Sequence, residues 1–296
     1  MKVFTGSSNP TLAKKLAQTL KVPFGKVKLS RFSNGEARVW IQDKHPHEAA
    51  VIVQSLAPQP DQSLVEFTLI IDALKRFGVK KVIAVMPYLG YSKQDKVFRP
   101  GEPLSAKVIV QMLQTAAFDQ LITFDLHNQA IVGFFNQPII QLSAQSLFLN
   151  HFAQLKTQDT LIVAPDAGSA KSSAQLAQKL GLEVVYIDKA RDLVSGKVSI
   201  KGISRSVKGK QLIIMDDMIV TGGTLIKAAE FLKKKGAVQI FVGATHHLYV
   251  PGTQAKISAS PIDQLIVSDT IQAPKQYNKL KIISVAPLLA AAIKKL

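Results

Sequence analysis

Short apolar runs recur along the chain, and most of them are separated by segments whose apolar residues have helical spacing. The clearest runs are residues 51–53, 82–85, 121–124, 161–163, 184–187, 212–215 and 240–242. Continuous runs of this length are typical of strands that are buried on both faces of a parallel sheet, with helices covering the sheet. The alternation therefore predicts an α/β fold.

The two halves of the chain resemble each other. A strand that follows residues 79–81 enters the polar turn 87–91, much as a strand that follows residues 209–210 enters an acidic pair. A chain of 296 residues also exceeds the ~100–200 residues usual for one domain. We therefore expect two similar domains, residues 1–150 and 151–296, with the boundary near 150–158 and the last helix able to pack back on the first domain. Ligands in such sheets gather at the carboxyl ends of the strands.

Composition sets limits on the class of protein. The chain has no cysteine, so disulfides and cysteine-bound zinc are excluded. The apolar run 282–293 is shorter than the ~20 residues that span a bilayer, and the start of the chain has no signal-peptide core. These features predict a cytoplasmic protein without a membrane segment.

The net charge of +17 favours anionic ligands. The lysines are scattered, few aromatic residues lie among them, and no zinc-finger or RNP pattern is present. Most of the charge is thus expected to be solvated surface lysine. Phosphorylated substrates explain the rest better than a dedicated nucleic-acid groove.

The most informative segment runs from residue 211 to residue 224. A strand leads into Asp216 and Asp217, and then a turn opens a helix; the turn consists of Val220, Thr221, Gly222, Gly223 and Thr224. Two adjacent carboxylates suit the two vicinal hydroxyls of a ribose, and a glycine turn at a helix start offers backbone N–H groups to a phosphate. The alternative is an ordinary turn between a strand and a helix. The whole combination favours a site for a phosphorylated sugar.

Several common catalytic motifs are absent from the sequence. There is no G-x-x-x-x-G-K-[ST], G-x-G-x-x-G, H-E-x-x-H or G-x-S-x-G. The sequence therefore argues against a P-loop NTPase, a Rossmann dehydrogenase, a zincin and an α/β-hydrolase.

Six motifs together resemble those of the ribose-phosphate diphosphokinases, also called phosphoribosyl diphosphate synthetases. They occur in family order and cover nearly the whole chain: residues 31–36, 87–95, 125–127 with 133–135, 165–166, 189–191 and 216–224. Residues 98–105 look closer to the archaeal-type branch. The resemblance implies two phosphoribosyltransferase-like domains and the transfer of a diphosphoryl group from MgATP to ribose 5-phosphate, with AMP as the second product.

The resemblance also implies the catalytic and metal-binding residues. Lys189 and Arg191 would be catalytic, on a basic lid at 188–208, and His127 and Asp166 would bind Mg²⁺. Residues two apart on an extended segment face the same side, and magnesium takes few protein ligands. The alternatives are a solvated hairpin for the lid, a core or capping role for His127, and a helix N-cap for Asp166.

The ATP site implied by the resemblance is shared between two subunits. One subunit would supply Lys93, Gln94, Asp95 and Arg99, and its neighbour would supply Phe32, Asn34 and Glu36. The chain is therefore expected to self-associate. The alternative for Phe32 is a place in the core.

Some positions depart from the family pattern. Asn34 replaces the usual Asp, Lys93 the usual Arg, Ala190 a basic residue and Ile140 an acid. Lysine lacks the bidentate fork of arginine. Two other hypotheses thus remain, a non-catalytic regulatory homologue and a phosphoribosyltransferase.

Overall fold

The computed structural model describes the backbone of residues 1–191 and 198–296, and the side chains of residues 1–188 and 200–296. The chain forms two compact units. Unit 1 comprises Met1–Ala144, Asp269–Gln272 and Ser284–Leu296, and unit 2 comprises Gln145–Ser268 and Ala273–Ile283. Whether residues 1–150 and 151–296 fold as independent domains stays a prediction, because compactness alone does not establish independent folding.

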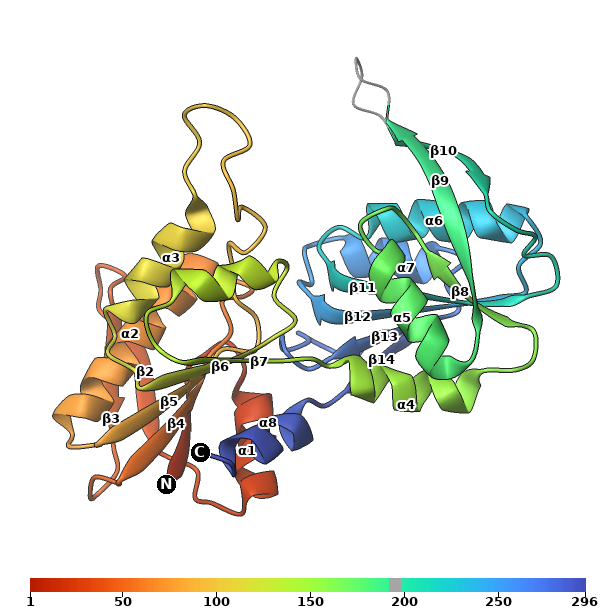
Figure 1. Ribbon diagram of the computed structural model, residues 1–296. Coiled ribbons are helices and arrows are strands. Elements are labelled where there is room, and N and C mark those ends of the chain that lie inside the picture. Colours follow the sequence, from red (N-terminus) through yellow and green to blue (C-terminus); the bar gives the residue numbers. More distant parts are fainter. Residues whose placement is uncertain (192–197) are drawn as a thin grey trace. The chain divides into compact units, whose positions relative to one another are not determined.

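Unit 1 is built on a five-stranded parallel sheet (Figure 1). Its strands, in spatial order, are β1 (Lys2–Thr5), β4 (Ala49–Val53), β5 (Lys81–Val85), β6 (Gln120–Phe124) and β7 (Ile139–Leu142). The helical elements are α1 (Pro10–Leu20), α2 (Pro60–Arg76), α3 (Ser105–Gln114), the short 3-10 helix η1 (Gln129–Phe134) and α8 (Ala286–Ile293). Helix α2 buries Phe67, Ile70 and Leu74 in the core beside the sheet.

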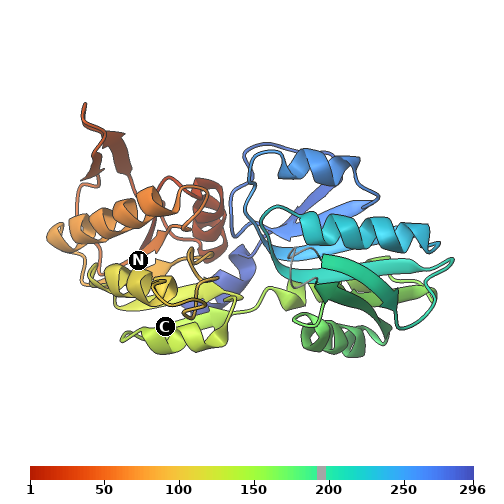
Figure 2. The ribbon, with the colours of Figure 1, turned by 90° about the horizontal axis from the view of Figure 1, so that it is seen from above.

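A separate antiparallel ribbon belongs to unit 1 and consists of β2 (Val27–Arg31) and β3 (Ala37–Ile41). Figure 2 shows this ribbon at the edge of the unit. Its residues Val27, Leu29 and Val39 pack against the core, while Trp40 on the other face is 56% exposed. One face of the ribbon is therefore anchored and the other is turned to solvent.

The C-terminal helix completes unit 1 by packing on α1. Asp269 links the residue before α8 to α1 and to the residue before α1. Its carboxylate accepts hydrogen bonds from the Val285 backbone N–H at 2.8 Å and from Lys15 Nζ at 3.0 Å, and its carbonyl accepts one from Asn9 Nδ2 at 2.7 Å. Because Asp269 is buried, these bonds are shielded from water and fix the return of the chain.

Unit 2 is built on a seven-stranded sheet that is parallel except for the pair β9–β10. Its strands, in spatial order, are β10 (Val198–Ile203), β9 (Glu183–Arg191), β8 (Thr160–Ala164), β11 (Gln211–Ile219), β12 (Gln239–His247), β13 (Gln264–Ser268) and β14 (Leu280–Ile283). The helices are α4 (Gln145–Leu155), α5 (Ala170–Leu180), α6 (Gly223–Lys234) and α7 (Thr253–Ala259).

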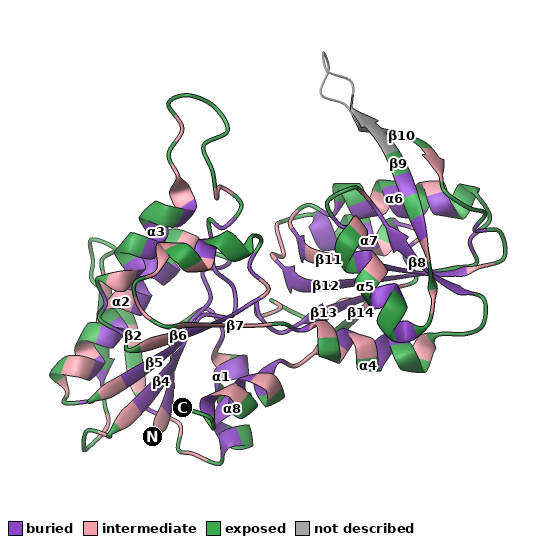
Figure 3. Ribbon diagram, in the orientation of Figure 1, coloured by how far each residue is buried: buried purple, intermediate pink, exposed green. Residues whose placement is uncertain are grey.

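The predicted fold class is confirmed, since both large sheets are mainly parallel and carry helices. All seven predicted strands are present, as β4, β5, β6, β8, β9, β11 and β12. Strands β5, β6 and β12 are buried at every residue but the first (Figure 3). Within the described ranges, none of the helices has the length and hydrophobicity needed to cross a bilayer.

Candidate active site

The acidic pair lies inside β11. The strand was expected to end at Met215, but it continues to Ile219 because β12 pairs with it as far as His247. On the other side, the described ladder with β8 stops at Ile214. Asp216 and Asp217 therefore lie where β11 has a neighbouring strand on one side only, at the carboxyl end of the sheet, where ligands of α/β proteins bind.

Hydrogen bonds and burial set the state of the acidic pair. The Asp217 backbone N–H donates to Asp216 Oδ1 at 2.9 Å, and the Met218 N–H donates to Asp217 Oδ1 at 2.7 Å. Burial, followed by the nearby charges of Asp217 and Asp166, raises the pKa of Asp216 to about 7. Negative charge is therefore crowded here, and a ligand that brings hydroxyl donors or a cation relieves it.

The glycine turn opens α6 as predicted. Gly222 has a φ of 70° and occupies the N-cap position, where a residue with a Cβ is strained. No side chain caps this end of α6, and Thr221, Gly223 and Thr224 are exposed. Backbone N–H groups at such a helix start attract phosphate. The helix buries Leu225, Ala228, Ala229 and Leu232, which recur at helical spacing.

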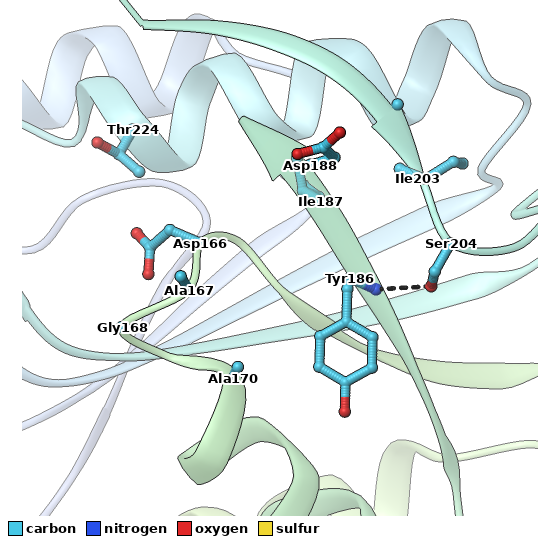
Figure 4. Close-up of a pocket in the computed structure, with 11 residues that line it drawn as sticks. Asp166, Ala167, Gly168, Ala170, Tyr186, Ile187, Asp188, Ile203, Ser204 and Thr224 are labelled. Carbon is cyan, nitrogen blue, oxygen red and sulfur yellow. Dashed lines mark hydrogen bonds between the residues drawn. The ribbon is translucent and has the colours of Figure 1, made fainter. Parts of the chain in front are cut away.

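A pocket of about 900 Å³ brings the start of α6 together with the loop after β8, strand β9 and the end of β10 (Figure 4). Thr224 lines it from α6, Asp166 from the loop after β8, and Asp188 from β9. The remaining lining residues are Ala167, Gly168, Ala170, Tyr186, Ile187, Gly202, Ile203 and Ser204. The structure thus places Asp166 and Thr224, the last residue of the glycine turn, in one cavity.

Asp166 also stabilises the start of α5. Its Oδ1 accepts a hydrogen bond from the Ser169 N–H at 3.1 Å, and its carbonyl accepts one from Ser169 Oγ at 2.9 Å. Ser169, not Asp166, occupies the N-cap position of α5, so the N-cap role considered for Asp166 is wrong, and its carboxylate instead holds the turn that precedes the helix. Asp166 therefore shapes this turn and also lines the pocket.

The lid residues fall on β9. The backbones of Lys189 and Arg191 pair with Ile200 and Val198 of β10, but their side chains lie outside those that the structure describes, as do residues 192–197 entirely. The described part of this hairpin contributes pocket residues that the sequence analysis missed, among them Tyr186 and Ser204. The Tyr186 N–H donates to Ser204 Oγ at 3.0 Å (Figure 4). Only strand pairing joins these two positions, so no local sequence signal identified them.

The predicted ATP residues of the ribbon lie at its tip. Phe32 is 50% exposed, which excludes the core role considered for it, and the Arg38 guanidinium lies 5.5 Å from its ring centroid. Asn34 Oδ1 accepts a hydrogen bond from the Glu36 N–H at 3.2 Å, and both residues are exposed. The turn is thus shaped by its own polar contacts and presents an aromatic face to solvent.

The other predicted ATP residues lie on the loop between β5 and α3. Gln94 Oε1 accepts a hydrogen bond from Ser105 Oγ at 2.5 Å, which ties the loop to the start of α3. Lys93 and Arg99 are exposed.

Asp95 links this loop to the segment after β6. Its Oδ2 accepts a hydrogen bond from Asn128 Nδ2, the residue next to His127. Since His127 is exposed, it is not a core histidine. Unit 1 therefore brings the predicted nucleotide loop beside the predicted metal ligand His127.

Comparisons with known proteins identify the family of the chain. A family model described as the N-terminal domain of ribose phosphate pyrophosphokinase matches residues 1–117, and one described as a phosphoribosyl synthetase-associated domain matches residues 193–296.

Similar proteins match the chain over nearly its whole length. The ribose-phosphate pyrophosphokinase of Ralstonia nicotianae is 38% identical over 97% of this chain and 92% of its own, and that of Wolinella succinogenes is 35% identical over 99% and 95%. The crystal structure of phosphoribosylpyrophosphate synthetase from Mycobacterium smegmatis superposes with a TM-score of 0.87 at 33% identity, covering 99% of this chain and 97% of that one. The chain therefore belongs to the ribose-phosphate pyrophosphokinase family.

Proposed function

We propose that this chain transfers the β,γ-diphosphoryl group of MgATP to the anomeric hydroxyl of ribose 5-phosphate, giving 5-phosphoribosyl 1-diphosphate and AMP. The observation that carries the proposal is the acidic pair of β11 followed by an uncapped helix start beside the pocket that holds Asp166. Family membership over nearly the whole chain gives the reaction.

The sugar phosphate would occupy the end of β11 and the start of α6. The backbone N–H groups of residues 221–224 would bind the 5-phosphate, and Val220 would lead the chain into this turn. Asp216 and Asp217 would accept hydrogen bonds from the ribose hydroxyls. Because charge is crowded around Asp216, hydroxyl donors at this point are more favourable than at an isolated carboxylate.

ATP would be held by two copies of the chain. Lys93, Gln94, Asp95 and Arg99 of one copy would bind its phosphates and base, and Phe32, Asn34 and Glu36 of a neighbouring copy would complete the site. The exposed Phe32 ring supports this assignment, since an aromatic face that is open to solvent can stack on adenine. We therefore propose a homo-oligomer with a shared ATP site. We also propose a cytoplasmic location, as expected from the sequence.

The side chains present fit a loosely held magnesium ion. Among the described residues, no group of three or more His, Asp or Glu side chains is close enough to hold a metal by itself. Magnesium keeps several waters and commonly uses one or two carboxylates together with substrate phosphates. His127 and Asp166 would provide the protein ligands, and the crowded charge of Asp166, Asp216 and Asp217 favours a cation. When bound, the ion would neutralise charge on the triphosphate.

The reaction itself would need positioning and charge stabilisation. O1 of the sugar would form a bond to the β-phosphorus and give its proton to water. The bond between the β-phosphorus and the oxygen shared with the α-phosphate would break, and AMP would leave with that oxygen. Lys189 and Arg191 would meet the negative charge that develops on the transferring group. No covalent intermediate with the protein is required.

A product assay tests this function. Wild-type protein with MgATP and ribose 5-phosphate should yield AMP and 5-phosphoribosyl diphosphate in equal amounts, and neither product without the sugar or without magnesium. Formation of ADP would contradict the transfer geometry. The substitutions at Asn34, Lys93 and Ala190 favour one competing hypothesis, a silent regulatory homologue. Binding of both substrates without any product would support that hypothesis instead.

A further inference from the structure

The phosphate turn (residues 220–224) is supported from behind by a segment that follows β12, which we call the brace (residues 248–257). The Leu248 N–H donates to the Ile219 carbonyl at 2.9 Å, just before the turn. Thr253 Oγ1 then donates to the Val220 carbonyl at 3.1 Å, and Thr253 is buried. A Cβ placed on Gly222 would lie 3.4 Å from Ile257 Cδ1, so α7 packs closely against the turn.

A buried histidine fixes the start of the brace. His247 Nδ1 accepts a hydrogen bond from the Tyr249 backbone N–H at 3.2 Å, and its Nε2 lies 3.1 Å from Gln254 Oε1. Because a backbone N–H can only donate, Nδ1 carries the lone pair and Nε2 carries the proton, which it donates to Gln254. The histidine therefore ties the last residue of β12 to the residue that follows Thr253.

Stacked aromatic rings hold the intervening turn. The His247 and Tyr249 rings lie 4.1 Å apart between centroids at an interplanar angle of 22°, and the Tyr277 ring stacks on Tyr249 at 6.2 Å. Tyr249 adopts a φ of 51°, a conformation that its hydrogen bond and stacking contacts maintain. The stacked rings before Thr253 and the bond from His247 to Gln254 after it thus fix the position of Thr253.

We infer that Thr253 is a positioning residue for the sugar phosphate, an inference that rests on the function proposed above. The Val220 carbonyl and the Thr221 N–H belong to one planar trans peptide, so they point in opposite directions. The Thr253 hydroxyl holds the carbonyl toward α7. It thereby aims the Thr221 N–H away from α7, toward the exposed side of the turn where the phosphate would bind.

The test compares Thr253→Val, which keeps the shape but loses the hydroxyl, with Thr253→Ser, which keeps the hydroxyl. Thr253→Val should weaken ribose 5-phosphate binding and raise its KM by about five- to tenfold, the equivalent of one lost hydrogen bond. The KM for ATP should stay close to the wild-type value, and Thr253→Ser should restore sugar-phosphate binding. Calorimetry with ribose 5-phosphate alone gives the affinity without turnover, and circular dichroism checks the fold.

Three results would overturn the inference: unchanged sugar-phosphate affinity in Thr253→Val, an equal loss of ATP affinity, or failure of Thr253→Ser to restore binding. If Thr253→Val does not fold, Thr253→Ala carries the same expectation. A wild-type protein that fails to bind ribose 5-phosphate would instead refute the proposed function, so the two failures are distinguishable.

Discussion

The backbone N–H of Asp217 donates a hydrogen bond to the side-chain carboxylate of Asp216 at 2.9 Å. The two acids also repel each other, and burial followed by the Asp217 charge raises the pKa of Asp216 to about 7. Each acid thus fixes the geometry or the charge of the other, and a substitution at one should be detected at the other.

We therefore expect Asp217→Asn to lower the pKa of Asp216 in the metal-free protein. The substitution removes the second-largest cause of the shift and leaves burial, so the pKa should move only part of the way from about 7 toward 3.8. Carboxyl ¹³C NMR titration measures this value. Asp159→Asn is the control, because Asp159 is paired with Lys210 elsewhere in unit 2 and should leave Asp216 unchanged.

The same Asp217→Asn variant should weaken ribose 5-phosphate binding far more than ATP binding. A charge-assisted hydrogen bond is worth about 1.5–3 kcal/mol, which corresponds to a roughly ten- to hundredfold loss of affinity. Calorimetry with each substrate alone separates the two effects. Unchanged sugar-phosphate affinity in both Asp216→Asn and Asp217→Asn would count against the proposed ribose contact.

Removal of the lid cation should reduce turnover. Lys189→Ala is expected to lower kcat by about 10³-fold with little change in either KM, because the cation would meet charge mainly in the transition state. Lys201→Ala is the matched control, since Lys201 is an exposed lysine on β10 of the same hairpin. A Lys189→Ala protein that keeps more than about a tenth of the wild-type kcat would rule out the catalytic role.

Activity should depend on self-association if the ATP site is shared. Lys189→Ala and Phe32→Ala chains should each be inactive alone, and mixing them should restore part of the activity, because one intact site can form at a hybrid interface. Native mass spectrometry must confirm that mixed oligomers are present. Such oligomers without recovered activity would refute the shared site. Trp40→Ala is the control, because Trp40 lies on the same ribbon but not at its tip with the proposed ATP residues. If Phe32→Ala loses activity through a lost ATP contact and not through lost assembly, Trp40→Ala should stay active.

His247 should make the stability of unit 2 pH-dependent. Burial lowers the pKa of His247 below the ordinary value of 6.5. Above pH 6.5 the histidine is neutral in both the folded and the unfolded chain, so its protonation costs no folding stability there. As the pH falls below 6.5, the unfolded chain binds a proton first, and stability is lost until the folded pKa is reached. His151 acts in the same direction, because burial also lowers its pKa.

Thermal unfolding between about pH 5 and 8 measures this effect. His247→Gln should flatten the loss of Tm on the acidic side relative to the wild type. His151 contributes to the slope that remains, and Asp216, whose folded pKa is about 7, contributes to it with the opposite sign. The exposed His45 provides the control through His45→Gln. Identical pH slopes for the wild type and His247→Gln would contradict the prediction.

The sequence predicted the strands that contain an uninterrupted apolar run, and most of these are buried on both faces, although Tyr186 of β9 is exposed. Strand β13 carries the same signal in Leu265, Ile266 and Val267, but it was not identified. The ribbon β2–β3 could not be identified in this way, because the exposed polar residues Lys28, Ser30 and Arg38 interrupt its apolar runs. The apolar run 282–293 divides into the end of β14 and helix α8, a division that follows from tertiary packing.

The candidate site was predictable where its residues are consecutive. The acidic pair and the glycine turn lie within one segment, so local sequence describes both. Tyr186 and Ser204 meet only through the antiparallel pairing of β9 and β10, and Thr253 reaches Val220 only because β11 and β12 are neighbours. Those contacts depend on the assembled sheet, and no spacing within the chain encodes them.

Packing of α8 on α1 has a consequence for synthesis of the protein. Domains of a nascent chain usually fold in the order in which they leave the ribosome. Here the last described strand of unit 2 ends at Ile283, before the helix that covers α1 of unit 1 has been made. The second unit can therefore reach its final packing before the first does. A message truncated near its end would produce a chain whose second unit is complete and whose first helix lacks its α8 neighbour, which leaves part of that helix open to chaperones and proteases.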